Sequence, residues 1–395
     1  MSMRRSGPEL ADYLARIARF NTRREQPTRW QLEVHAGPDF LERMCHERPG
    51  RVAIFSGRNR GKAQRILSAV EAGINVLADK PLIVDRKELP VLEAALTAAD
   101  DRGLIVYDMS SGSRQAIIAT LMRLLRNDPK VFGDPVPGTL SDPGVTVASL
   151  HHIMKQVAGV PNLRPPWFFD TTQQGESLAD VGTHLIDRVH TTLFSDQAID
   201  YRTEIRLHTA SRWPTMLSAA QFRQVTGEVA WPEYLEPWLN ADTLEYFCNT
   251  RLQYEVRGIH ITVETRWDWG AQVGDDTHNA SYRGSRARLE LRQGPAERYR
   301  SEIYVVPVAD IDTALERRIA GLQTTYPGVG LVKLRGEWRV TIPDALRIGH
   351  EEHFAQMTRR FLDDVEHRRS PTPWEKPNSL AKYYVCTEGV ALSRA

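Results

Sequence analysis

The sequence has few cysteines and no long apolar run. Its three cysteines, Cys45, Cys248 and Cys386, are far apart and odd in number, which excludes a disulfide framework and a zinc-site spacing and suits a reducing compartment. No apolar run approaches the length of a membrane span, and the opening "MSMRRSGPEL" has no apolar region behind its arginines. We therefore expect a cytoplasmic protein with no secretory signal and no membrane partner.

The sequence also has no excess of charge. Its net charge is +1 over 395 residues, so nothing in the total favours a nucleic-acid partner. A hydrophobic content of 41% is ordinary for a globular protein, and the length suffices for two domains. The segment "GHEEHF" (349–354) spaces its histidines i, i+3 and is not H-E-x-x-H. We therefore predict no metal site.

A third absence concerns dinucleotide binding. No G-x-G-x-x-G occurs, and no strand precedes the helix-like segment 8–20; such a turn normally holds the pyrophosphate at a helix N-terminus. The segment "SGRNRGK" (56–62) is the one other phosphate-binding candidate, because Arg58, Arg60 and Lys62 stand beside two glycines. A basic solvated loop accounts for the same residues equally well.

Residues 31 to 107 alternate between short apolar runs and helix-like segments. The strand candidates are 32–36, 51–57, 74–78 and 104–108, and the helix candidates are 38–47, 61–73 and 88–103. This alternation predicts βαβ units and a parallel sheet of four strands. Right-handed crossovers place the carboxyl ends of the strands on one edge, which then carries the Ser56–Arg60 loop, Asp79, Lys80 and Asp108.

The second half of the chain has a different pattern. Residues 244–270 and 280–294 each read as two strands joined by a turn, at Arg257-Gly258 and Gly284-Ser285, and 302–308 reads as a further strand. Helices are expected at 110–127, 177–193, 310–322, 351–367 and 379–393. The sequence thus predicts an α/β protein. A Rossmann-like parallel sheet, incomplete at its N-terminus, occupies residues 1–108. An α+β domain with a mainly antiparallel open sheet occupies 109–395, and its last helix packs back on the first domain.

The stretch "NVLADKPLIV" (75–84) ends an apolar strand in a carboxylate, an ammonium and a proline. Open α/β folds place their ligands at the carboxyl ends of parallel strands. This position favours a catalytic role for Lys80. The alternative is a solvated strand end followed by a turn-forming proline.

The segment "GESLADVGTHLIDRVHTTLF" (175–194) is a second candidate site. On a helical wheel, Asp180, His184 and Asp187 fall on the side opposite the apolar residues. A solvated helix face accounts for this pattern. The chemistry favours a general base instead, because a histidine flanked by two carboxylates has a supported tautomer and a raised proton affinity.

"EAGINVLADKPL", followed about a hundred residues later by "GESLADVGTHLID", resembles the glucose–fructose oxidoreductase / inositol dehydrogenase superfamily (Gfo/Idh/MocA). The blocks "PNLRPPWFFD" and "PWEKPNSLAKYYV" resemble its branch with an oxidoreductase C-terminal domain. The resemblance implies that Lys80 is the catalytic lysine and that Asp180 and His184 are the active-site aspartate and histidine. Asp79 stands where the family's motif has glutamate.

The resemblance also implies a nicotinamide cofactor, NAD or NADP. The residues expected to bind it are Ser56, Arg58, Asn59, Asp79, Lys80, Pro81 and Asp108. Six polar or aromatic residues outside the two motifs' catalytic positions are candidates for substrate binding: His151, His152, Lys155, Trp167, Asp187 and His278.

The expected function is oxidation or reduction of a hydroxyl or ketone on a sugar-like or polyol substrate. An NAD-dependent glycoside-cleaving enzyme and a cofactor-less sugar- or partner-binding relative are the alternatives. The family associates through the open sheet, so a homo-oligomer, a dimer or tetramer, is expected. Three explanations compete for the missing first unit. They are a start that lies inside a longer gene product, a naturally shortened relative that no longer binds a dinucleotide, and replacement of the glycine-rich turn by the 56–62 loop.

Overall fold

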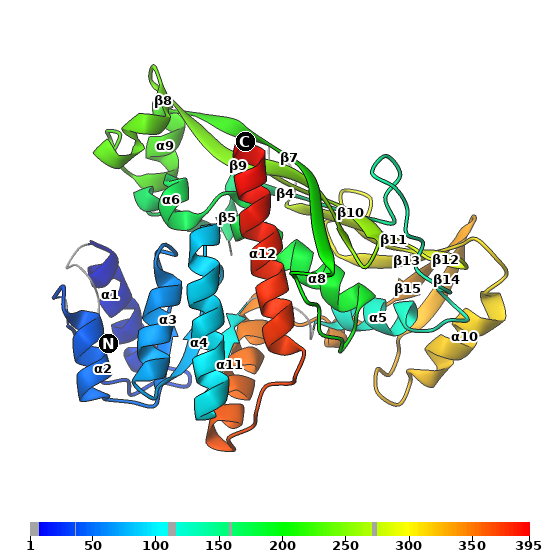
Figure 1. Ribbon diagram of the computed structural model, residues 1–395, viewed down its shortest axis with the longest axis horizontal. Helices are drawn as coiled ribbons and strands as arrows, with labels where there is room; N and C mark the ends of the chain where they lie inside the picture. Colours follow the sequence, from blue (N-terminus) through cyan, green and yellow to red (C-terminus); the bar gives the residue numbers. More distant parts are fainter. Residues whose placement is uncertain (1–7, 36, 110–115, 158–159, 271–274) are drawn as a thin grey trace.

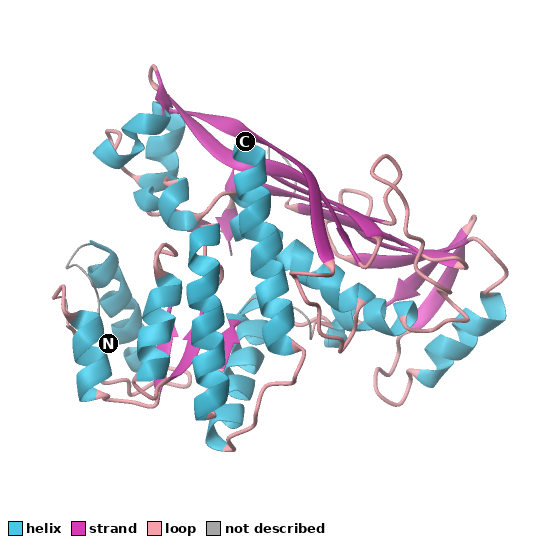
Figure 2. Cartoon of the chain, in the orientation of Figure 1, coloured by secondary structure: helices cyan, strands magenta, loops and turns pink. Residues whose placement is uncertain are grey.

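The structure, a computed structural model, describes residues 8–35, 37–109, 116–157, 160–270 and 275–395. It contains a small parallel sheet with helices against it and a long, open sheet that extends away from it (Figures 1 and 2). The protein is therefore a mixed α/β protein with one parallel and one mainly antiparallel sheet, as the sequence predicts.

The parallel sheet has three strands in the order β1-β2-β3. Its strands are β1 (Val52–Phe55), β2 (Asn75–Ala78) and β3 (Val106–Asp108), linked by α3 (Lys62–Glu71) and α4 (Leu89–Arg102). The two helices pack against each other beside the sheet. Phe361 of α11 (His350–Glu366) covers Leu77 and Ile105 in a separate cluster. Gly103 closes α4 in the left-handed conformation, with φ of 62°.

The prediction of a fourth parallel strand at 32–36 is wrong. The described residues before β1 form two helices, α1 (Pro8–Thr22) and α2 (Phe40–Glu47), and Leu32–Val34 are not a strand. Val34 is exposed, so the apolar pattern at 32–36 buries no strand face. Within the described part of the chain, β1 pairs only with β2, and Ile54 of β1 remains exposed.

The large sheet has ten strands. Nine follow the order β14-β15-β13-β12-β11-β4-β10-β9-β7, and β8 pairs with β9. All pairs are antiparallel except β4 with β10, which run parallel in the register Val263↔Val147. The strands are β4 (Val145–Met154), β7 (Ile205–Ser218), β8 (Leu239–Asn240), β9 (Thr243–Val256), β10 (Ile259–Gly270), β11 (Thr277–Arg283), β12 (Ala287–Gln293), β13 (Glu302–Pro307), β14 (Gly330–Leu334) and β15 (Glu337–Thr341).

Both predicted hairpins are confirmed. β9 turns into β10 at Arg257-Gly258, where both residues have positive φ, and β11 turns into β12 at Gly284-Ser285. The predicted strand at 302–308 is β13. The strands β4, β7, β8, β14 and β15 were not predicted. A short two-stranded ribbon, β5 (Gln156–Val157) with β6 (Val160–Pro161), lies outside both sheets.

Helices cover one face of the large sheet, and its other face carries no helix among the described residues (Figure 1). The helices of this part are α5 (Ile117–Arg126), α6 (Thr171–Gln174), α7 (Ser177–Asp180), α8 (Gly182–Leu193), α9 (Ala219–Thr226), α10 (Asp312–Gly321) and α12 (Glu375–Arg394). Short 3-10 helices lie at Arg86–Glu88, Pro166–Phe169, Glu233–Trp238 and Asp344–Leu346. Residues 110–115 of the predicted helix 110–127 lie outside the described residues.

Helix α12 lies between the two sheets (Figure 1). It contacts β7, α7 and α8 on one side and α4 on the other. Its residues Leu380 and Tyr383 belong to the core of the parallel unit, whereas Val385 and Val390 belong to the core of the large sheet. None of the described helices is long and apolar enough to cross a membrane.

Candidate functional site

Lys80 and Asp180 form the centre of the candidate site. Lys80 follows the carboxyl end of β2, and its ammonium forms an ion pair with the Asp180 carboxylate. The same ammonium donates a hydrogen bond of 3.3 Å to the Asp180 main-chain oxygen. Residues a hundred positions apart thus meet between the parallel unit and α7. The Lys80 side chain keeps 22% of its surface exposed, so the pair remains open to a ligand.

The charge state of Asp180 is set by this pair. Burial alone would raise the pKa of Asp180, but the Lys80 ammonium and its hydrogen bond outweigh burial and hold this pKa below its usual value. Asp180 is therefore a carboxylate at neutral pH, although only 6% of the residue is exposed.

His184 lies one helical turn after Asp180, in α8. Burial lowers the pKa of His184 to about 3, and the positive charges of Lys80 and Arg188 act in the same direction, against the Asp180 carboxylate. The expectation of a raised proton affinity is therefore wrong, because burial and two cations outweigh the carboxylate. The ring is neutral at physiological pH, which is the state that accepts a proton.

Asp187 does not join Asp180 and His184. The carboxylates of Asp187 and Asp108 both face the buried ammonium of Lys382 in α12, at 3.7 Å and 2.5 Å. The hydroxyl of Tyr383 also donates to Asp108, at 2.7 Å. Asp187 and Lys382 are 1% and 0% exposed. The alternative of a solvated helix face is therefore wrong at Asp187, because α12 covers this residue and Lys382 pairs with it. Asp187 thus joins two elements of the core and does not face an open site.

Asn59 is turned into the protein. Its side-chain amide donates to the Gln174 main-chain oxygen at 2.7 Å, and its carbonyl oxygen accepts from Lys62 at 2.7 Å. The Lys62 ammonium also donates to the Asp79 main-chain oxygen at 2.7 Å. Burial lowers the pKa of Lys62 to about 8, against the opposing charge of Asp79. Lys62 therefore fixes the loop after β1 to the strand end that carries Lys80.

Three N–H groups of this loop, at Asn59, Arg60 and Gly61, are already used. Those of Asn59 and Arg60 donate to the Gln173 main-chain oxygen at 3.0 Å and 3.2 Å. The Gly61 N–H donates to the Glu88 carboxylate at 2.7 Å. A phosphate needs such groups free, so the main chain of this loop is a poor phosphate cradle. The side chains of Ser56 and Arg58 remain exposed, and Arg58 lies over the ring of Trp167, 5.7 Å from its centroid.

A second polar cluster forms around Asp276, which directly precedes β11. His151 and Lys155 contact its carboxylate at 3.0 Å and 2.7 Å, and the main-chain N–H of His152 donates to it at 3.1 Å. Burial alone would raise the pKa of Asp276, but the hydrogen bonds from His151 and Lys155 lower it far below its usual value. Three of the predicted substrate residues are thus brought together at the end of β4.

Two arginines connect this cluster with Asp180 and His184. The charge of Arg164 acts on both Asp180 and Asp276. Arg188 contacts His278 at 3.3 Å, and its charge lowers the pKa of both His278 and His184, in each case after the larger effect of burial. Sequence reasoning missed both arginines. The only signal for Arg188 is its position four residues after His184, on the same helix face.

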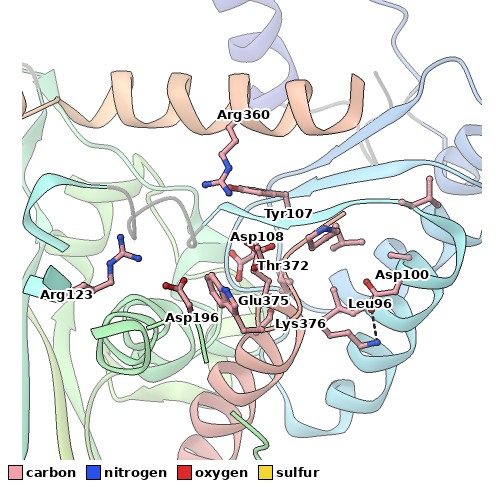
Figure 3. Close-up of a pocket in the computed structure, with 17 residues that line it drawn as sticks. Leu96, Asp100, Tyr107, Asp108, Arg123, Asp196, Arg360, Thr372, Glu375 and Lys376 are labelled. Carbon is pink, nitrogen blue, oxygen red and sulfur yellow. Dashed lines mark hydrogen bonds and ion pairs between the residues drawn. The ribbon is translucent and has the colours of Figure 1, made fainter. Parts of the chain in front are cut away.

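A cavity of about 340 Å³ lies at the open edge of β3, between α4, α11 and α12 (Figure 3). Arg360 reaches into it from α11 towards Tyr107, and Lys376 pairs with Asp100 at 2.9 Å. Of the predicted site residues only Asp108 lines it. The cavity is thus separate from Lys80, Asp180 and His184.

Residues 121–394 match the family model described as "Putative oxidoreductase C terminal domain". The chain is similar to the solved structure of a "putative oxidoreductase" from Parabacteroides merdae ATCC 43184. The identity is 38% and the TM-score 0.95, with coverage of 99% of this chain and 90% of that chain. No match is found among the curated proteins.

More distant structures share the fold. One is a levoglucosan dehydrogenase in complex with NADH and levoglucosan, with 15% identity, a TM-score of 0.59 and coverage of 99% of this chain and 88% of that chain. Another is KijD10, a 3-ketoreductase from Actinomadura kijaniata in complex with TDP-benzene and NADP, with 17% identity, a TM-score of 0.51 and coverage of 92% and 81%. At these identities the likeness shows the fold alone. The family match and the Parabacteroides structure agree with the resemblance inferred from the motifs: the chain belongs to the family of oxidoreductase enzymes that carry the "Putative oxidoreductase C terminal domain".

Proposed function

We propose that the chain is an NAD(P)-dependent oxidoreductase that acts on a hydroxyl or ketone of a sugar-like or polyol substrate. The contact between Lys80 and Asp180, with His184 one turn away, is the observation that carries the proposal. It joins an ammonium, a carboxylate and a neutral imidazole at the carboxyl edge of the parallel sheet, where α/β folds bind ligands. Two fold relatives were solved with NADH and a sugar, or with NADP.

The described residues fit one end of such a cofactor. A nicotinamide bound at the carboxyl edge of β2 would lie beside Lys80 and Pro81, where it would accept or donate a hydride. The loop offers few main-chain donors to the pyrophosphate, because the N–H groups of Asn59, Arg60 and Gly61 already form hydrogen bonds within the protein. The exposed side chains of Ser56, Arg58 and Arg60 remain as phosphate contacts in this loop.

Each residue of the site has a distinct role in the proposal. The Lys80 ammonium donates a hydrogen bond to the reacting oxygen and stabilises negative charge on it. The neutral ring of His184 accepts the hydroxyl proton during oxidation and returns it during reduction. The Asp180 carboxylate holds Lys80 in place and stabilises the protonated ring. The cluster of His151, Lys155 and Asp276 supplies the hydrogen-bonding groups that polyol recognition requires.

We propose further that the protein is cytoplasmic and that copies associate through the helix-free face of the large sheet. A cofactor-less binding protein is the second candidate, because the N–H groups of Asn59, Arg60 and Gly61 in the loop after β1 are satisfied internally. The glycoside-cleaving alternative uses the same three residues, and the redox state of the cofactor after turnover distinguishes it.

Calorimetric titration with NAD⁺, NADH, NADP⁺ and NADPH tests the proposal. We expect micromolar binding of at least one of the four, and turnover of a polyol or sugar that His184→Gln abolishes. Binding without loss of turnover in His184→Gln would contradict the assigned roles. Absence of binding to all four would favour the cofactor-less candidate for this chain.

A further inference from the structure

Three residues of the large sheet form a cluster that is not part of the site around Lys80. His208 of β7, Glu255 of β9 and His260 of β10 come from three neighbouring strands. One ligand atom from each residue lies within 4.8 Å of the other two. We propose that they bind a divalent transition-metal ion, with zinc as the preferred ion. This inference does not rest on the proposed function.

The strand register explains how the cluster forms. Glu255 lies directly opposite His260 in the β9–β10 pair, so both side chains share one face of the sheet. On the other side, Leu207 pairs with Tyr254 and Thr209 pairs with Gln253, and His208 is the extra residue between them. A bulge of this kind redirects a side chain. It brings His208 beside Glu255, with 3.0 Å between Nε2 and Oε2.

The geometry suits a tetrahedral ion. Both imidazoles direct Nε2 to the same carboxylate oxygen, at 3.0 Å for His208 and 3.7 Å for His260. Zinc binds nitrogen and oxygen ligands at about 2.0–2.1 Å, which places tetrahedral ligands roughly 3.3 Å apart. The two observed distances bracket this value. Two histidines and one carboxylate also leave the fourth position for water.

A hydrogen bond to Glu255 explains the position of His208 but not that of His260. His208 is within hydrogen-bond distance of Glu255, but His260 at 3.7 Å is not. The Nδ1 atom of His260 is buried and has no hydrogen-bond partner among the described residues. This atom points away from the cluster's Nε2 and carries no part of the argument for an ion, which rests on the positions of the three ligand atoms. An ion on Nε2 would hold both imidazoles at once.

The surroundings of the cluster permit an ion to enter. They also keep the Glu255 carboxylate available as a ligand. The three side chains are 14%, 24% and 22% exposed for His208, Glu255 and His260. Arg206 lies opposite Glu255 in the β7–β9 register. No ion pair joins Arg206 to Glu255 in the part of the chain that the structure describes. The carboxylate therefore interacts with the two imidazoles and not with this cation.

Titration with zinc chloride tests the proposal. The full chain, free of any histidine tag and stripped with a chelator, should bind one zinc ion, with two imidazole nitrogens and an oxygen in the zinc X-ray absorption spectrum. His208→Gln, Glu255→Gln and His260→Gln should each weaken binding by more than the ~10–100-fold that loss of an outer partner typically causes. His367→Gln is the matched control, because His367 lies on the surface, 55% exposed, and pairs with Asp363 at 3.0 Å. The zinc affinity of this variant should equal that of the wild type.

A thermal measurement separates loss of the site from loss of the fold. Zinc should raise the unfolding midpoint of the wild type and of His367→Gln, since an ion that binds only the folded chain stabilises it. It should not raise the midpoint of His208→Gln, whose metal-free midpoint should equal that of the wild type. The proposal is overturned if the wild type does not bind zinc. It is overturned equally if a His208→Gln/His260→Gln double variant binds zinc with wild-type affinity.

Discussion

At the scale of single residues, Lys80, Asp180 and His184 set one another's charge. Lys80 holds Asp180 ionised, and the same ammonium helps to keep His184 neutral. Each of these effects depends on partial removal from water, because burial strengthens interactions between charges. Removing one group should therefore change the titration of the others as well as the chemistry.

The pH dependence of stability tests the state of His184. Its pKa is about 3 in the folded chain against 6.5 in the reference state, so the unfolded chain binds the additional proton between these values. Acidification through this window therefore lowers the free energy of unfolding. Between pH 7 and pH 5 we expect this histidine to account for up to about 2 kcal/mol of the loss.

His184→Gln should lack that part of the pH dependence. Urea unfolding of the wild type and of the variant at pH 7 and pH 5 measures it. His367→Gln, at the exposed residue that follows α11, serves as the control and should follow the wild type. Equal losses in His184→Gln and the wild type would show that this ring titrates at its ordinary value.

The ion pair itself is tested by Lys80→Met. This change leaves the Asp180 carboxylate buried without its cation, which typically costs about 3–5 kcal/mol of stability. It also removes the hydrogen bond to the reacting oxygen, so turnover should fall by about 10²–10³-fold. The double variant Lys80→Met/Asp180→Asn should recover stability but not turnover. If stability stays low in the double variant, the pair is not the source of the loss.

At the scale of elements, local signals predicted most helices and both hairpins. The turn at Arg257-Gly258 is predictable because glycine adopts positive φ at little cost. At Gly284-Ser285 the glycine is required by close approach instead, since an added Cβ would lie 2.2 Å from the Phe132 main-chain oxygen. The parallel pairing of β4 with β10 was not predictable, since it joins strands more than a hundred residues apart. The bulge at His208 has no sequence signature either. It depends on the register of β7 against β9.

The buried Lys382 of helix α12 can be tested at the scale of elements. Lys382→Met removes the buried ammonium between Asp108 and Asp187, and we expect a loss of about 3–5 kcal/mol in the free energy of unfolding. Lys376→Met is the matched control on the same helix. Its ion pair with Asp100 is partly exposed, so its loss should cost at most about 1 kcal/mol. Urea unfolding of both variants decides the comparison. Similar losses would argue against a special role for the buried cluster.

At the scale of the whole molecule, the candidate site depends on contacts between distant segments. The motifs identified Lys80, Asp180 and His184, and the structure places the first two in contact. The same motifs could not show that Asp108 and Asp187 turn towards Lys382, because that lysine lies about 200 residues beyond Asp187. Nor could they identify Asp276, whose partners come from the far end of β4. Spacing along a helix predicts a shared face, not which segment covers it.

The two units should unfold together because α12 belongs to both cores. Leu380 packs in the core of the parallel unit, whereas Val385 packs in that of the large sheet. Leu380→Ala should cost about 2–5 kcal/mol by leaving a cavity, and it should weaken the attachment of the parallel unit. Hydrogen exchange in increasing urea follows peptides of α3 and α4 separately from those of β9 and β10. In the wild type we expect the peptides of α3, α4, β9 and β10 to exchange at the same urea concentration. In Leu380→Ala the peptides of α3 and α4 should exchange at a lower urea concentration than those of β9 and β10. Separate transitions already in the wild type would mean that the shared helix does not couple the units, and that the Lys80–Asp180 contact must form between parts that move independently.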